Sequence, residues 1–250
     1  MSWTIYSARV TGAAHIEEGL PCQDAFAVET VGDVLVAVVA DGAGSARYSD
    51  EGSRALSDAV IAALIPLAQD IPSGKAAIES AVTGAIETVR ARILRPETVL
   101  RDFAATLVGC VYHPSRGGFF FHIGDGAAVA ARVPDWSGLA VSRPANGEFA
   151  NETFFYTMDN WREQLRWTPI PPGADLVALM TDGPMPFVMS IGQEGLFPDF
   201  AGPIDAHLSQ LDIEAGSADL TATIDSDSAR EISSDDKTLI WTKWRAEPTT

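Results

Sequence analysis

The sequence predicts an α+β layered sandwich in which antiparallel β-sheets are flanked by antiparallel helix pairs. Short apolar runs rich in β-branched residues are interrupted by two long helical patterns, without the strict strand–helix alternation of a parallel sheet. Hydrophobic residues make up 46% and charged residues 20% of the 250 residues, so the chain can bury a sizeable core. Chains of this length often fold as one unit, and we expect a single domain over residues 1–250.

Residues 34–40 carry the clearest strand pattern. This run, Val-Leu-Val-Ala-Val-Val-Ala, stops at Asp41-Gly42, which is typical of a strand that is buried on both faces and ends in a turn. Its partner is expected at residues 25–30, across a turn at residues 31–33.

Two helical segments follow. Residues 49 to about 67 place alanine and leucine at helical spacing, with Ser49 or Asp50 as the candidate N-cap. Residues 75 to about 94 repeat helical periodicity, and Pro96 marks the end of the pattern. Together they predict a helical pair.

The second half of the chain is dominated by strand patterns. Three apolar runs joined by short turns predict an antiparallel meander, at residues 104–112, 118–124 and 127–133. Two further strands are expected at residues 175–181 and 237–244.

Two stretches are expected to be less regular. Residues 184–229 combine glycine, proline and short helical patches, which predicts an irregular, flap-like insert of the kind that often covers a site. Residues 245–250 are expected to form a short frayed tail.

The charge balance excludes several classes of partner. With 17 Lys+Arg against 34 Asp+Glu, the net charge of −17 repels nucleic-acid phosphates and anionic lipid, so neither nucleic acid nor membrane is expected as a partner. Residues 1–6 lack the basic start, apolar stretch and cleavage site of a signal peptide, so export is not expected. No apolar run approaches the roughly 20 residues that span a bilayer. The two cysteines, Cys22 and Cys110, lack the spacing of a disulfide scaffold or zinc site. We therefore expect a cytoplasmic protein.

Acidic residues at the ends of predicted strands are the candidate functional groups. They are Asp24, Asp41, Asp125, Asp182 and the pair Asp235-Asp236. Taken singly, an Asp-Gly step is more often a turn than a ligand. Asp125 fits the turn interpretation best because a strand follows at once, Asp41 fits it worst because a helix follows, and Asp182 is intermediate.

If several of these strand ends meet at one edge of the sandwich, the carboxylates repel one another and some must stay protonated. A divalent cation removes that penalty. Clusters of carboxylate and carbonyl oxygens suit Mg²⁺ or Mn²⁺, whereas zinc would require His or Cys at ligand spacing. The glycines after Asp41 and Asp182 allow a backbone carbonyl to approach a cation.

Five acidic motifs, taken in their order along the chain, resemble a known family. The ordered set comprises Gln23-Asp24, Asp41-Gly42, Gly124-Asp125-Gly126, Thr181-Asp182-Gly183 and Asp235-Asp236-Lys237-Thr238-Leu239. It is similar to the PPM (PP2C-type) metal-dependent serine/threonine protein phosphatases, and the glycine-rich stretch after Asp41 looks most like the bacterial branch.

The resemblance implies two central sheets packed face to face, a helix pair on each outer face, and a centre of two divalent cations, Mn²⁺ or Mg²⁺, at one end. It implies that Asp41 bridges both cations and that the Gly42 carbonyl binds one of them. Asp182 and Asp235 would complete the shell of the other, with Asp236 as the alternative to Asp235.

The same resemblance assigns the remaining acidic residues. Asp24 would act near the first cation, largely through water, and Asp125 with Asp182 would match a third, weaker site. Asp41, Asp182 and Asp235 are then the candidate catalytic residues. Two cations about 3.5–4 Å apart can lower the pKa of a bridging water and clamp phosphoryl oxygens, so that hydroxide attacks phosphorus in line without a covalent enzyme intermediate.

The sequence departs from the family pattern around the substrate. Many members place an arginine shortly before the Asp24-type aspartate, where this chain has Gly19 and Leu20, and the histidine that follows Asp-Gly in eukaryotic members is Ala43 here. His15 and Arg47 are the candidate substitutes for substrate binding.

The predicted activity is hydrolysis of phosphoserine and phosphothreonine in proteins, with a phosphorylated protein as substrate and a cognate Ser/Thr kinase as its opposing partner. Two alternatives remain at this stage. One is a pseudophosphatase that binds phosphoproteins, and the other is a hydrolase of small phosphate esters.

Overall fold

The side chains of the strands alternate between two apolar environments, and this alternation sets the layers of the molecule. In β3 (Val34–Ala40), every residue is buried. Leu35, Ala37 and Val39 contact residues of a second sheet, whereas Val36 and Val38 face a pair of helices. A strand that is buried on both faces must therefore lie inside a sandwich of sheet and helix layers.

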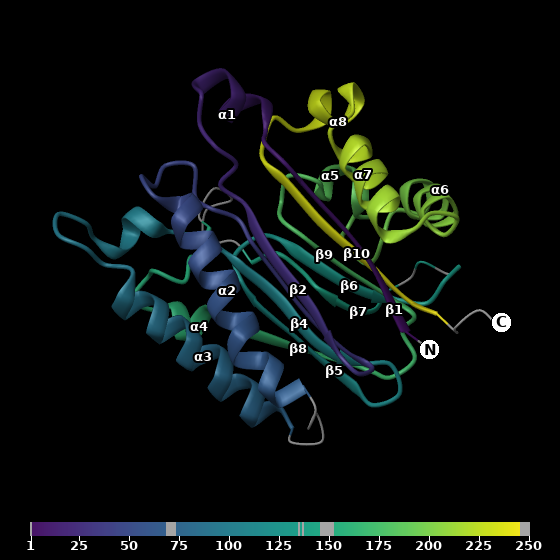
Figure 1. Ribbon diagram of the computed structural model, residues 1–250, viewed down its shortest axis with the longest axis horizontal. Coiled ribbons are helices and arrows are strands. Elements are labelled where there is room, and N and C mark those ends of the chain that lie inside the picture. The colour runs from purple at the N-terminus through teal and green to yellow at the C-terminus, as the bar shows by residue number, and fades with distance from the viewer. Residues whose placement is uncertain (1, 69–73, 135, 137, 146–152, 246–250) are drawn as a thin grey trace.

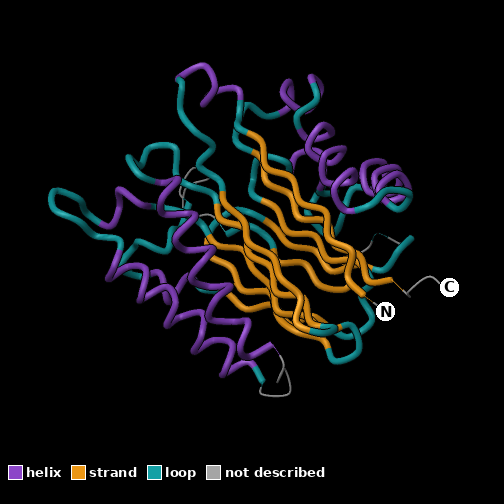
Figure 2. Tube along the Cα trace, viewed as in Figure 1, coloured by secondary structure: helices purple, strands orange, loops and turns teal. Residues whose placement is uncertain are grey.

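The computed structural model describes residues 2–68, 74–134, 136, 138–145 and 153–245, and these residues form four layers (Figure 1). Two five-stranded sheets, antiparallel throughout, pack face to face at the centre (Figure 2). The first has the order β1 (Ser2–Val10), β10 (Lys237–Arg245), β9 (Leu176–Met180), β6 (Ala127–Ala131) and β7 (Gly138–Ser142). The second has the order β2 (Ala25–Val31), β3, β4 (Leu107–His113), β5 (Gly117–Ile123) and β8 (Arg166–Ile170).

Helices cover both outer faces. The second sheet is covered by α2 (Ser49–Ala68) and α3 (Lys75–Arg92), which bury Leu56, Val60 and other apolar side chains against it. The first sheet is covered by α5 (Met185–Val188), α6 (Pro198–Leu208) and α7 (Ile213–Ile224), and α8 (Asp227–Ile232) contacts α5 and α7 (Figure 1). Gly216 lets α7 approach closely, because a Cβ there would lie 2.3 Å from the Tyr6 ring of β1.

The described residues include three further short helices. They are α1 (Ala13–Glu18), η2 (Leu100–Phe103) and α4 (Trp161–Gln164). The first two lie close to the strand ends that carry the acidic residues, as described below. The two ends of the described chain also lie side by side, because Ser2 pairs with Arg245 across β1 and β10.

Most predicted elements are confirmed. β3 has the expected bounds, β2 and β10 each extend one residue beyond the expected range, and α2 begins at the expected N-cap candidate Ser49. The layered α+β architecture is confirmed as well.

Two expectations were wrong. The predicted meander forms only between β4 and β5, because β6 pairs with β7 and β9 in the other sheet. Residues 184–229, expected to be an irregular insert with short helical patches, are more regular than that and contain α5, α6, α7 and the first residues of α8. Of the predicted tail 245–250, Arg245 belongs to β10 and residues 246–250 lie outside the described residues.

Candidate metal centre

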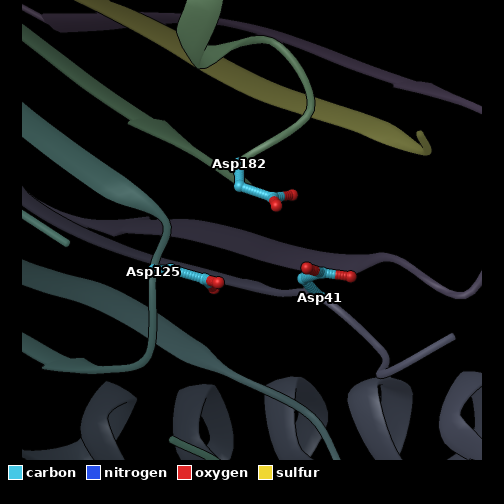
Figure 3. Close-up of side chains that lie close together, drawn as sticks. All are labelled: Asp41, Asp125 and Asp182. Atoms are coloured by element: carbon cyan, nitrogen blue, oxygen red, sulfur yellow. The ribbon is translucent and has the colours of Figure 1, made fainter. Parts of the chain in front are cut away.

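Three carboxylates that are distant in sequence meet at one end of the sandwich. Asp41 follows β3, Asp125 lies between β5 and β6, and Asp182 follows β9. Each contributes a carboxylate oxygen, and these oxygens all lie within 4.8 Å of one another. The three side chains point toward a shared space (Figure 3).

Backbone contacts fix the position of Asp41. Its amide donates a hydrogen bond to Thr106 Oγ1 at 3.0 Å, and the Thr106 amide donates to the Asp41 carbonyl at 2.8 Å. The next residue, Gly42, has no room for a side chain, because a Cβ would lie 2.6 Å from the Gln23 carbonyl oxygen and 2.9 Å from Ser49 Cβ. The strand end is therefore held between the start of β2 and the start of α2.

Asp125 lies where the chain crosses from one sheet to the other. Gly124 makes the crossing possible with a φ of 105°, a conformation that favours glycine. The hairpin-turn interpretation of Asp125 is therefore wrong, because β5 and β6 do not pair. Its Oδ2 accepts a hydrogen bond from Thr153 Oγ1 at 2.5 Å, and its Oδ1 is buried without a hydrogen-bond donor among the described residues.

Asp182 presents a second unsatisfied oxygen. Its Oδ1 is buried and receives no hydrogen bond from the residues described. Gly183 allows this turn to pack closely on β10, because a Cβ would lie 2.0 Å from the Asp236 carbonyl oxygen. Two buried oxygens that lack donors thus converge on the same space, and each carries a desolvation cost that a ligand would remove.

The electrostatics of the cluster favour protonation or a cation. Burial raises the pKa of Asp182 to about 7, with further contributions from the charges of Asp235 and Asp125. Burial also raises the pKa of Asp41 well above its usual range, and the surrounding carboxylates, led by Asp24 and Asp182, raise it further.

A divalent cation would supply the missing charge. The donor set consists of oxygen atoms, it includes two buried oxygens with unused lone pairs, and it suits Mg²⁺ or Mn²⁺. The residues present therefore fit the metal that the sequence predicts.

Asp24 lies beside this cluster and is almost completely buried. Its Oδ2 accepts a hydrogen bond from Thr181 Oγ1 at 2.8 Å. Burial raises the pKa of Asp24 to about 7; the hydrogen bond from Thr181 lowers it, and the charge of Asp236 raises it.

The neighbouring residues Asp235 and Asp236 face different surroundings. Asp236 is 2% exposed, and both of its oxygens accept backbone amides at 2.6 Å, Oδ1 from Gly12 and Oδ2 from Gln23. The side chain of Asp235 is close enough to the cluster for its charge to raise the pKa of both Asp41 and Asp182. Burial also raises the pKa of Asp235 itself.

His15 and Arg47, the predicted substrate-binding residues, lie at the margin of the cluster. His15 Nδ1 is 3.0 Å from Asp236 Oδ1, and a Cβ on Gly44 would lie 3.9 Å from His15 Nε2. His15 thus sits between Asp236 and the loop that follows Asp41. Arg47 is exposed, and its guanidinium lies 4.9 Å from the centre of the Tyr48 ring.

Sequence reasoning missed the threonines that orient the carboxylates. Thr181 was visible as the neighbour of Asp182, but its hydroxyl contacts Asp24 rather than the adjacent aspartate. Thr106 and Thr153 carry no local signal, because each reaches its aspartate only through the fold.

Comparisons with known proteins agree with this geometry. The chain matches the family model described as Protein phosphatase 2C over residues 11–224. It is 31% identical over 260 residues to serine/threonine-protein phosphatase 3 of Escherichia coli (strain K12), a match that covers 98% of this chain and 99% of that protein.

Solved structures share the fold at lower identity. A bacterial serine phosphatase has a TM-score of 0.65 at 13% identity, over 98% of this chain and 99% of that one. A sex-determining protein of C. elegans also has a TM-score of 0.65, at 14% identity, and this chain spans 65% of its length while 98% of this chain is covered. None of the described helices is both long and apolar enough to cross a membrane.

Proposed function

The chain belongs to the protein phosphatase 2C family, and from this premise we propose that it hydrolyses phosphoserine and phosphothreonine in proteins at the end of the sandwich where Asp41, Asp125 and Asp182 meet. The reaction consumes water and a phosphomonoester and releases the free hydroxyl side chain and inorganic phosphate. The observation that carries this proposal is the convergence of three carboxylates, two of them with buried oxygens that lack donors, from strand ends of both sheets.

The proposed cofactor is a pair of Mg²⁺ or Mn²⁺ ions, with a third, weaker site. Bound there, the cations lower the pKa of coordinated water and neutralise phosphoryl oxygens. Asp41 lies centrally and is proposed to contact both principal cations, with the carbonyl of Gly42 joining one of them. Asp182 and Asp235 would hold the other cation, and Asp125 with Asp182 would hold the third.

Asp24 and Asp236 are proposed to act differently. Asp24 is held by Thr181 and would accept hydrogen bonds from water near Asp41. Asp236 is already saturated by the amides of Gly12 and Gln23, so we assign it a structural role and place Asp235 at the metal.

Substrate contact is proposed for the loop that follows Asp41. His15 and Arg47 flank this loop and would contact the phosphoprotein in place of the arginine that many family members carry earlier in the chain. A Ser/Thr kinase must supply the phosphorylated substrate. Both cysteines are free thiols, which supports a reducing compartment as the place of action.

The test uses the purified full chain after chelation, with Mn²⁺ or Mg²⁺ added back. We expect release of phosphate from phosphoserine and phosphothreonine peptides only with metal, and loss of that release in Asp41→Asn. The matched control is Asp58→Asn, which removes a charge from the exposed surface of α2 and should leave turnover unchanged. Metal binding without hydrolysis of any phosphopeptide would overturn the proposal and favour a phosphoprotein-binding module.

A further inference from the structure

A cavity with two arginines opens beside the acidic cluster. Its volume is about 400 Å³. The lining residues come from three segments and are Ala43, Ser45, Ala46, Arg47, Arg101, Asp102, Ala104, Phe155, Thr157 and Met158. Ligand sites in proteins commonly have volumes in this range. The cavity is therefore large enough to take a side chain of a bound peptide.

The wall of this cavity is continuous with the metal centre. Ala43 lies two residues after Asp41, and its amide donates a hydrogen bond to the Ala104 carbonyl at 2.9 Å. Two residues further on, Thr106 holds the backbone of Asp41. A peptide whose phosphoryl group lies at the cluster would have neighbouring residues within reach of the cavity.

The charge of the cavity is opposite to that of the chain. Arg47 and Arg101 line it, and among the described residues neither forms an ion pair. Nearby Arg95 shows the contrast, because its guanidinium binds both oxygens of Glu51, at 2.7 and 2.9 Å. The chain has twice as many acidic as basic residues, and these two arginines have no acidic partner in the described part of it. Next to the proposed active site, they favour an anionic ligand.

The other lining residues refine the ligand. Asp102 is the one acidic residue in the lining, and its Oδ2 already accepts the Val99 amide at 2.9 Å. Phe155 and Met158 add apolar surface. The cavity thus suits a side chain with an apolar stem and an anionic end.

We propose that this cavity binds an anionic side chain next to the phosphorylated residue of the substrate, through Arg47 and Arg101. The proposal rests on the phosphatase function proposed above and narrows its substrates to acidic phosphopeptides. A carboxylate or a second phosphoryl group would supply the same charge, and the experiment separates these two sources.

The test compares three otherwise identical phosphoserine peptides that carry Gln, Glu or a second phosphoserine at a flanking position, each placed in turn before and after the scissile residue. For the wild-type chain with Mn²⁺, we expect kcat/KM for an anionic peptide to exceed that for the Gln peptide by about tenfold, the effect of one charge-assisted contact. The preference should fall as salt is raised. Preference for Glu identifies a carboxylate, and preference for the doubly phosphorylated peptide alone identifies phosphoryl as the source.

Variants connect this preference to the cavity. Arg101→Gln and Arg47→Gln should each reduce the ratio of kcat/KM between anionic and Gln peptides by severalfold, and Arg101→Glu should favour a peptide with Lys at that position. A merely structural defect would lower kcat/KM for all peptides by the same factor and leave the ratio unchanged. The matched control is Arg116→Gln, in the turn between β4 and β5 outside this cavity, which should keep the wild-type ratio.

The two proposals fail in different ways. Hydrolysis of all peptides with no preference, or a preference that survives in both arginine variants, overturns the cavity proposal and leaves the phosphatase proposal standing. Absence of hydrolysis for every peptide overturns the phosphatase proposal.

Discussion

Asp236 is buried and Asp182 is half-buried; both lie at the ends of neighbouring strands, yet their oxygens have opposite surroundings. Asp236 accepts one backbone amide on each oxygen at 2.6 Å, which ties residues 12 and 23 to the start of β10. Asp182 has a buried oxygen without a donor among the described residues, and it faces Asp41 and Asp125. The first arrangement is complete within the protein, and the second requires a partner from outside it.

The difference shows how to separate a structural carboxylate from a metal ligand in one cluster. Burial disfavours a charged carboxylate, and backbone amides offset that cost without any ligand. Asp182 faces other carboxylates instead of amides, so the fold alone does not offset the cost of burying its charge. Loss of Asp236 should therefore damage stability, and loss of Asp182 should damage activity.

The largest expected effect is on turnover in Asp182→Asn. Removing this charge should lower kcat with Mn²⁺ by about 10³-fold, because the substitution removes a proposed metal ligand on which transition-state stabilisation would depend. Without metal, the variant should be at least as stable as the wild type, since one buried like charge is gone. Phosphate release and thermal unfolding after chelation measure the two effects, and near-normal turnover would exclude Asp182 from the metal centre.

The second effect is the loss of stability in Asp236→Asn. An amide side chain offers a single acceptor oxygen, so its NH₂ group would face the amide of Gly12 or Gln23 and leave a buried donor unpaired. We expect the free energy of unfolding to fall by about 3–5 kcal/mol. Urea unfolding of the metal-free protein measures this, with Asp58→Asn as the exposed control; equal stability of the two variants would contradict the structural role.

The third effect is the pH dependence of the metal-free protein. The pKa values of Asp24 and Asp182 are raised to about 7 in the fold, so between about pH 4 and pH 7 the folded state binds more protons than the unfolded state. Stability should fall as pH rises through this window, by on the order of 3 kcal/mol from pH 5 to pH 7. Saturating Mn²⁺ should remove or reverse the slope, because the cation favours the charged carboxylates. If the stability of the metal-free protein did not change with pH in this window, burial would not raise the pKa values of these carboxylates.

The sequence could supply those parts of the fold that have a local signal. β3 is one uninterrupted apolar run, and α2 begins at a residue suited to cap a helix. β1 was missed although Tyr6, Ala8 and Val10 alternate with more exposed residues, as expected of a strand with one face on the core. The pairing of β6 was wrong because a glycine-rich turn can join two strands of one sheet or cross between two sheets, and the choice depends on contacts far away in the chain.

In the candidate site, too, the sequence predicts what has a local signal and does not predict what depends on distant contacts. The order of the acidic motifs and their resemblance to a family predicted a metal centre that also includes Asp24 and Asp235 or Asp236. The structure brings oxygens of Asp41, Asp125 and Asp182 within 4.8 Å of one another. The sequence alone could not show which of Asp235 and Asp236 has the structural role. What distinguishes Asp236 is a pair of backbone amides that lie 224 and 213 residues away in the chain. Hydrogen-bond partners at such separations are set by topology rather than by the motif.

The smallest expected effect tests whether the hydroxyl of Thr153 orients the carboxylate of Asp125 for metal binding. Thr153 donates to Asp125 Oδ2 at 2.5 Å, and Oδ1 is buried without a donor among the described residues. Thr153→Val keeps the branched shape and removes the donor, so Asp125 should lose orientation while remaining charged. We expect Mn²⁺ affinity at the weakest site to fall by about three- to tenfold, measured by calorimetry and by the Mn²⁺ dependence of turnover. Thr83→Val is the control, because that hydroxyl binds only backbone carbonyls within α3. If both variants bind Mn²⁺ as the wild type does, Asp125 needs no help from Thr153, and the fold of the crossing after Gly124 is enough to aim its carboxylate.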